Sequence, residues 1–196
     1  VGRLFSKWGL LLWLLVVGSS VVLAFTHWPE LTKNLVDRVL AGQNIVILLL
    51  TFPLVKLIHE FGHAYATRVQ GGEVHEMGVM FLILMPIPYV DASSSSAFSG
   101  RWQRALVGSA GMLTELFIAA LALRVWLNAE PGFLSAMMYN TMIIAGVSTL
   151  LFNANPLIRF DGYYILADVL EIPNFGTRST RYLGYLLQRY LFGIEG

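Results

Sequence analysis

The sequence predicts an all-α polytopic membrane protein with about four transmembrane helices. Of its 196 residues, 56% are hydrophobic and 13% are charged, whereas a soluble domain carries about 25% charged residues. Several apolar runs approach the roughly 20 residues that a helix needs to cross a hydrocarbon core. The absence of cysteine excludes disulfides and thiolate-bound metal, and a net charge of +1 gives no reason to expect a nucleic-acid partner.

Four apolar runs predict the membrane spans, at residues 8–25, 44–67, 102–127 and 134–152. Trp28 follows the first run, as expected where a helix reaches the membrane interface. A shorter helix is expected at 162–170, after the chain breaks at 153–156. The last segment, 178–192, alternates basic and apolar residues, which is typical of a helix that lies on a membrane surface.

Residues 68–100 predict a less regular structure. Residues 73–84 have the composition of a strand, and Pro86 and Pro88 exclude a continuous helix. The apolar stretch at 77–85 is too short to cross a membrane as a helix, so we expect a re-entrant or protein-covered segment.

The placement of basic residues predicts the orientation, because Lys and Arg concentrate on the cytoplasmic side of a membrane protein. With the N-terminus in the cytoplasm, nine Lys and Arg residues lie on the inner side and three on the outer side, and Lys56 falls within the second span. Residues 59–63 then lie toward the cytoplasmic end of that span.

One stretch of the second span, His59-Glu60-Phe61-Gly62-His63, carries the residue types of a metal site. Residues four apart share a helix face, so His59 and His63 can bind one ion, and Glu60 is placed to act on a metal-bound water. Gly62 is expected to leave room on the helix near the metal. The alternative is a pair of buried histidines bonded to neighbouring carbonyls, but an ionisable residue inside a span indicates function by default.

A catalytic zinc ion takes three protein ligands and keeps one position open for water. Asp161, which follows the break at 153–156, is the candidate third ligand. The alternative for Asp161 is a capping role at the start of the helix near Gly162. Capping explains its position, but not why a carboxylate recurs on the same predicted side as the histidines.

The two motifs together resemble the site-2 protease family of intramembrane zinc metalloproteases. That family pairs His-Glu-x-x-His on one core helix with Asn-x-x-Pro-x-x-x-x-Asp-Gly two core helices later, which matches Asn153 to Gly162 in this chain. The resemblance covers the second to fourth spans, about two thirds of the sequence. It implies a three-helix metalloprotease core with one Zn²⁺ ion.

The resemblance also implies a role for each matched residue. The metal ligands would be His59, His63 and Asp161, and Glu60 would be the catalytic base. Asn153 would hold the substrate backbone near the metal.

The irregular stretch has a counterpart in the family as well. Relatives carry a re-entrant β segment that is thought to pair with the substrate, and residues 74–90 correspond to it. A helical substrate must unwind to expose its peptide bonds, and an added strand satisfies the freed backbone. The sequence around the motifs is similar to a bacterial subgroup of peptide zinc metalloproteases, which implies an inner-membrane location and a secretion-adaptor-like region or partner.

One position departs from the family pattern. Relatives often have Gly-Pro-x-x-Asn in the middle core helix, and the matching run here, Gly111 to Glu115, ends in a second intramembrane carboxylate. Glu115 is expected either to bond groups near the site or to face a neighbouring subunit. Lys56, one turn before His59, can extend to the interface or pair with Glu115.

The sequence therefore predicts a zinc metalloprotease that hydrolyses peptide bonds in a membrane-embedded or membrane-delivered peptide. We expect a first span with an external connection at 1–43, the metalloprotease core at 44–170, and a basic amphipathic segment at 171–196 that continues in a longer protein. A non-catalytic, zinc-stabilised subunit of a peptide maturation or export assembly is the alternative. A metal transporter ranks last, because the ionisable groups cluster at one depth.

Overall fold

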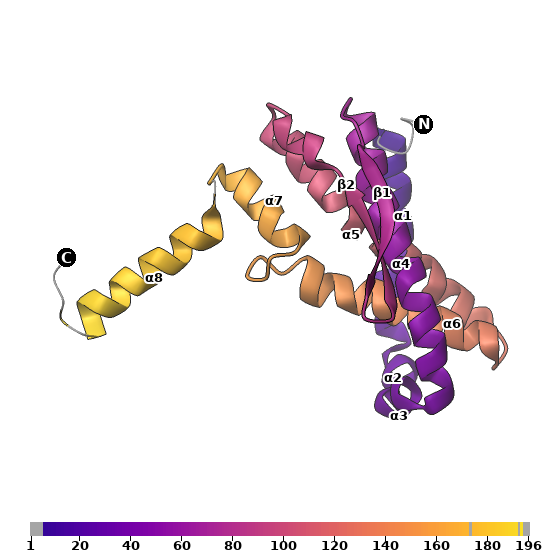
Figure 1. The fold of residues 1–196 in the computed structure, drawn as a ribbon. Helices are drawn as coiled ribbons and strands as arrows, with labels where there is room; N and C mark the ends of the chain where they lie inside the picture. The colour runs from indigo at the N-terminus through magenta and orange to yellow at the C-terminus, as the bar shows by residue number, and fades with distance from the viewer. Residues whose placement is uncertain (1–5, 173, 192, 194–196) are drawn as a thin grey trace.

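The computed structural model of the chain describes residues 6–172, 174–191 and 193, and this part is mostly helical (Figure 1). Within it, four helices are long and apolar enough to cross a membrane: α1 (Lys7–Thr26), α4 (Gly42–Val69), α5 (Arg101–Asn128), and the continuous helix formed by α6 (Phe133–Met142) and η3 (Ile143–Asn153). They contain the four predicted spans, so the prediction of an all-α polytopic membrane protein is confirmed. The parts of the predicted segments that fall on residues 1–5, 173, 192 and 194–196 lie outside the described residues.

Shorter helices connect and flank the spans. They are α2 (Trp28–Thr32), α3 (Leu35–Leu40), η2 (Ser93–Ala97), α7 (Asp161–Leu170) and α8 (Phe175–Leu191). Pro29 lies in the first turn of α2, where its missing N–H removes no hydrogen bond. The shorter helix that the sequence predicts after the fourth span is α7.

α5 lies at the centre of the bundle and packs against α1, α4, α6, η3 and α7. Its contact with α4 is built from small side chains: Ala66, Val107 and Ala110 form a cluster in which no residue is more than 2% exposed. Small residues let two backbones approach closely, which favours helix association in a membrane. By contrast, α1 leaves most of its apolar side chains exposed, as expected for a helix that contacts lipid.

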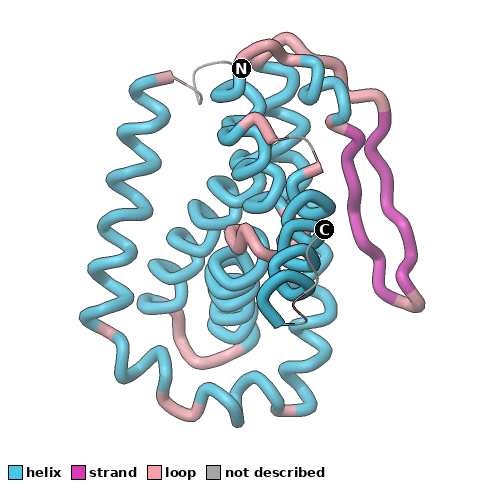
Figure 2. Tube along the Cα trace, turned by 90° about the vertical axis from the view of Figure 1, so that its left-hand side faces the viewer, coloured by secondary structure: helices cyan, strands magenta, loops and turns pink. Residues whose placement is uncertain are grey.

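Two antiparallel strands, β1 (Glu76–Leu82) and β2 (Met85–Asp91), form a hairpin beside α4. The hairpin stands at one edge of the bundle, and α1 stands at the opposite edge (Figure 2). β2 packs along α4, whereas β1 lies outside it and exposes nearly all of its side chains. This two-stranded sheet occupies the region in which the sequence predicts strand composition and excludes a helix.

The register of the hairpin explains how β2 accommodates two prolines. Residues 83–84 form a two-residue turn, so the flanking pair, Leu82 and Met85, exchanges backbone hydrogen bonds. In an antiparallel ladder every second pair does the same, beginning with Met80 and Ile87. Pro86 and Pro88 occupy the pairs between, where a backbone N–H would point away from β1. The prolines therefore remove no ladder hydrogen bond, and they deprive the outer edge of β2 of two donors.

The fourth span changes its winding along its length. α6 is an α-helix, and η3 continues it as a π-helix, in which hydrogen bonds span five residues and each turn is wider. Thr149 and Asn153 are buried on η3 and both contact α5. π-Helical turns are rare and occur frequently at functional sites. The helix ends at Asn153, at the break that the sequence predicts.

α8 extends away from the bundle (Figure 1). At 100° per residue, Arg178, Arg181 and Arg189 fall on one side of this helix, whereas Leu183 and Leu187 fall on the other and are exposed. A basic face opposite an apolar face is the pattern of an interfacial helix. The expectation that this segment lies on a membrane surface stays a prediction.

Candidate metal centre

Two histidines of α4 and the first residue of α7 meet at one point. The Nε2 atoms of His59 and His63 are 3.0 Å apart, and Asp161 Oδ2 lies 3.1 Å from the first and 3.4 Å from the second. The three side chains are 7%, 12% and 24% exposed, respectively. Asp161 is far from the two histidines in the sequence, so the packing of α4 and α7 against α5 brings the three side chains together.

The spacing of these three atoms fits a tetrahedral zinc site. With zinc–ligand distances of about 2.0–2.2 Å, tetrahedral ligand atoms are separated by roughly 3.3 Å. The observed separations of 3.0, 3.1 and 3.4 Å lie on either side of that value. Asp161 Oδ2 is buried without a hydrogen-bond donor among the described residues, which is expected of an oxygen that a cation would satisfy. Imidazole nitrogen and carboxylate oxygen are also ligands that zinc accepts.

Neighbouring groups fix the orientation of the two rings. Nδ1 of His63 is 2.9 Å from the carbonyl oxygen of Val107 on α5. Nδ1 of His59 is 3.3 Å from Glu115 Oε1, which is an ion-pair distance, although the direction is not that of a hydrogen bond. Metal-binding histidines usually have such an oxygen behind the second nitrogen, because it selects the tautomer that leaves Nε2 free for the metal.

α5 leaves room for the rings at Gly111. A Cβ there would lie 2.4 Å from His63 Nε2 and 2.6 Å from His59 Nε2, so a larger residue would displace the metal-facing nitrogens. The expectation that Gly62 provides this room was wrong. A Cβ at Gly62 would meet Thr114 Oγ1 at 2.6 Å, so Gly62 allows the close contact of α4 with α5.

Asp161 reaches the histidines because the chain folds back tightly after η3. Gly162 permits that approach, since a Cβ there would lie 2.6 Å from the carbonyl carbon and oxygen of Ala154. Asp161 is the first residue of α7, the N-cap position belongs to Phe160, and no side-chain capping bond is present there. The carboxylate is directed at the histidines, which contradicts the capping alternative.

Glu60 lies beside the ligands on α4. It follows His59 and is half-buried, and no described residue forms a hydrogen bond or ion pair with its carboxylate. It lies three positions before His63, so the two share part of one helix face. A carboxylate in this position is available to act on a water at the open metal position.

A second carboxylate lies behind the ligands. Glu115 on α5 is fully buried, and its Oε1 accepts a hydrogen bond of 2.7 Å from Lys56. Its Oε2 accepts hydrogen bonds from the hydroxyl of Thr149 and, at 3.0 Å, from the amide of Asn153. Of the expected roles, Glu115 therefore bonds groups near the site, and Lys56 pairs with it.

Two polar residues of η3, Asn153 and Thr149, bond to Glu115. Asn153, expected to hold the substrate backbone, donates its amide to Glu115 in this structure, and its role toward a substrate stays a prediction. Thr149 was missed, although a usable signal exists: it is a polar residue four positions before Asn153 in an apolar run.

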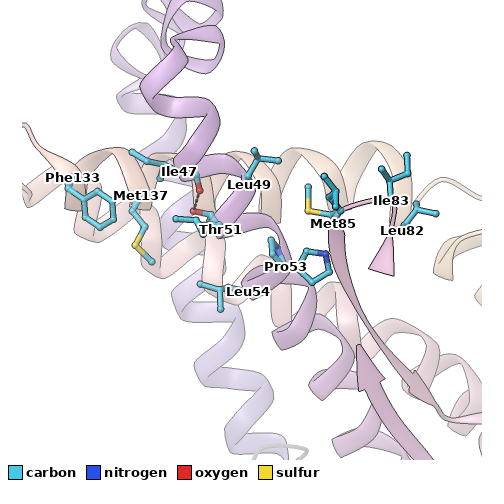
Figure 3. A pocket seen from close by; sticks show the side chains of 13 residues that line it. Ile47, Leu49, Thr51, Pro53, Leu54, Leu82, Ile83, Met85, Phe133 and Met137 are labelled. Carbon is cyan, nitrogen blue, oxygen red and sulfur yellow. Dashed lines mark hydrogen bonds between the residues drawn. The ribbon is translucent and has the colours of Figure 1, made fainter. Parts of the chain in front are cut away.

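An apolar groove of about 940 Å³ opens between the tip of the hairpin, α4 and α6 (Figure 3). Its walls include Leu82 and Met85 of the hairpin, Leu54 of α4 and Phe133 of α6. Leu54 precedes His59 by five residues, which is about 7.5 Å along the helix. The groove thus adjoins the helix that carries the ligands without containing the ligands themselves.

Comparisons with known proteins support a zinc-dependent chemistry. The chain is 24% identical over 165 residues to a Bacillus subtilis (strain 168) protein named "Putative peptide zinc metalloprotease protein YydH". The match covers 82% of this chain and 62% of that protein, so the chain spans less than two thirds of its relative. A comparison with models of known protein families gave no match, and neither did a comparison with solved structures. The relative and the His59, His63 and Asp161 group together indicate a zinc metalloprotease relationship.

Proposed function

We propose that the chain contains the core of an intramembrane zinc metalloprotease of the site-2 protease kind, which hydrolyses peptide bonds in a membrane-embedded or membrane-delivered peptide. The observation that carries the proposal is the triangle of His59 Nε2, His63 Nε2 and Asp161 Oδ2, whose sides measure 3.0 to 3.4 Å. Three protein ligands leave one position for water, as in catalytic rather than structural zinc sites. We place it in a bacterial inner membrane because of its resemblance to the bacterial subgroup, and the Lys and Arg distribution supports a cytoplasmic N-terminus.

The residues around the triangle support hydrolysis. A zinc ion held there would supply a water of lowered pKa and would polarise the substrate carbonyl. Glu60 takes the proton of the attacking water and gives it to the leaving amine, because its carboxylate is unpaired and adjoins the ligands. Lys56 is held by Glu115 and takes no part in the proton transfer.

The free edge of β1 supports binding of the substrate as an added strand. Met77, Val79 and Phe81 occupy the pairs whose backbone N–H and C=O groups point away from β2, and they are 41%, 53% and 74% exposed. In hydrocarbon, unpaired backbone groups are costly, so an extended peptide is favoured there. β2 offers a poorer edge because Pro86 and Pro88 lack donors.

Replacing Glu60 with Gln tests the proposed base. Glu60→Gln keeps the side-chain volume but removes the proton acceptor, so zinc content should stay at the wild-type level while the cleavage rate falls by about 10²- to 10⁴-fold. The measurement combines metal analysis of the full-length protein in lipid with mass spectrometry of peptides encoded beside its gene. Asp161→Ala is the matched control, since it should lose the metal as well as the cleavage.

Three outcomes separate the alternatives. Normal cleavage by the Glu60→Gln protein would contradict the assignment of the base. A wild-type protein that holds zinc but cleaves none of the peptides would favour the non-catalytic, zinc-stabilised subunit of an export assembly. A wild-type protein that binds no zinc would contradict the metal centre itself.

A further inference from the structure

We propose that Glu115 is a positioning residue of the metal centre, which holds the His59 ring from behind and ties it to the end of η3. The proposal rests on the proposed function, because it concerns the same zinc site. It assigns Glu115 no contact with the substrate or the metal. Its effect is transmitted through His59 and through the segment that leads from Asn153 to Asp161.

The two carboxylate oxygens of Glu115 contact two different helices, α4 and η3. Oε1 faces α4, with Lys56 Nζ at 2.7 Å and His59 Nδ1 at 3.3 Å. Oε2 faces η3 and accepts from Thr149 and Asn153. One side chain of α5 therefore contacts the element that carries two metal ligands and the element that precedes the third.

The burial of Glu115 makes these contacts necessary. Its side chain has no exposed surface, and an unpaired charge in such a place is strongly destabilising. Lys56 supplies the balancing charge, so the pair is neutral as a unit. The charges of Asp161 and Glu60 then remain to balance a divalent cation.

The two histidines differ in what stands behind them. His63 is backed by the carbonyl oxygen of Val107, which every residue at that position would supply. His59 is backed by a side chain, and no other acceptor for its Nδ1 is found among the described residues. The orientation of His59 therefore depends on the residue at position 115, whereas that of His63 does not depend on the residue at 107.

The test replaces Glu115 with Gln in the full-length protein and measures zinc affinity by competition with a chelator. Loss of a carboxylate behind a metal-binding histidine commonly weakens metal binding 10- to 100-fold, so a loss of about that size is expected. Cobalt is the second probe, because its visible absorption spectrum reports the ligand geometry, and the Glu115→Gln protein should show a changed spectrum. Glu115→Asp, which keeps the charge, should recover part of the affinity.

Matched variants separate positioning from stability. Thr149→Val removes one hydrogen bond to Glu115 and leaves its charge and the His59 contact, so zinc affinity should change by less than about threefold. The double variant Lys56→Met/Glu115→Gln removes the ion pair as a unit. It should unfold at a higher temperature than Glu115→Gln alone but bind zinc no more tightly, because the acceptor behind His59 is still changed.

Wild-type zinc affinity and an unchanged cobalt spectrum in Glu115→Gln would overturn the proposal. So would a variant that loses thermal stability without losing zinc affinity, since this would show a structural role only. If Glu115→Gln alone does not fold, the double variant and Glu115→Asp decide the matter by the same two measurements. Failure of the wild-type protein to bind zinc would instead overturn the proposed function.

Discussion

Two polar clusters lie on α5, about 13.5 Å apart along the helix from the buried Glu115 to the partly buried Arg124. The first is the candidate metal centre with Glu115 behind it. The second surrounds Arg124, whose guanidinium joins α5 to α1. Both place charged groups among apolar helices, where unpaired charge is costly. The clusters differ in how they are paired: the Arg124 cluster forms its hydrogen bonds within the protein, whereas the candidate metal centre contains unpaired polar atoms.

Arg124 uses its terminal N–H groups entirely within the protein. They donate to the carbonyl oxygens of Val16 and Ala120, both at 2.9 Å, and to the hydroxyls of Ser19 and Ser20. No described carboxylate lies within ion-pair distance of this guanidinium. Arg124 is therefore a structural link between two helices.

The candidate metal centre contains a buried polar atom that forms no hydrogen bond. Asp161 Oδ2 is buried and has no hydrogen-bond partner among the described residues, and the two histidine Nε2 atoms face each other beside it. Burial of a polar group is thus a weak sign of a binding site by itself. Convergent ligand atoms without partners are the stronger sign, because native proteins rarely leave such atoms unsatisfied.

Filling the space at Gly111 should produce the largest effect. Gly111→Ala should reduce zinc affinity by at least about 100-fold, since the methyl group would lie 2.4 Å from His63 Nε2 and push both rings away from a common ion. Gly146→Ala on η3 is the matched control, because its nearest neighbour would be Ala119 Cβ at 3.8 Å. Chelator competition measures both variants. Equal affinity of Gly111→Ala and wild type would mean that the unpaired atoms do not form a metal site.

Removing Arg124 should lower stability and leave the metal centre intact. Arg124→Met loses hydrogen bonds that join α5 to α1, and we expect the free energy of unfolding to fall by about 2 kcal/mol. Zinc affinity should stay within about twofold of wild type, because the clusters share no residue. Titration with SDS measures the stability. A loss of zinc affinity as large as that of Glu115→Gln would show that the two clusters form one network.

The spans and the strand region could be predicted because they depend on local composition. Long apolar runs need helices in hydrocarbon, and Pro86 and Pro88 exclude a helix wherever they stand. The winding of η3 could not be predicted in this way, because an α-helix and a π-helix suit the same apolar residues. The choice depends on packing against α5, which brings Thr149 and Asn153 to one carboxylate.

The three residues that could hold a metal ion could be identified from the sequence, since His59 and His63 are spaced for one helix face and Asp161 follows a break. Their surroundings could not. Val107 contributes a backbone carbonyl, which has no sequence signature. Gly111 acts by lacking a side chain opposite the rings, and only the crossing of α4 and α5 shows which glycine that is.

A third polar cluster consists of two asparagines, and we expect its loss to have the smallest effect on stability. Asn44 on α4 and Asn140 on α6 exchange amide hydrogen bonds of 3.1 and 2.7 Å, so both side chains are paired as Arg124 is. Asn140→Leu should lower the free energy of unfolding by about 1 kcal/mol, which is within the range for interhelical hydrogen bonds in membranes. SDS titration of each single variant and of Asn44→Leu/Asn140→Leu gives the coupling energy.

The double variant should recover most of that loss, because no amide is then left without a partner. Zinc affinity should not change in any of the three proteins, since Asn44 precedes His59 by fifteen residues, about 22 Å along α4. If Asn140→Leu weakened zinc binding while the double variant restored it, the pairing of α4 with α6 would be setting the position of the ligand helix. In that case a fully paired polar cluster would also affect zinc binding. Unpaired polar atoms would then show where the binding site lies, but they would not identify every residue that controls its affinity.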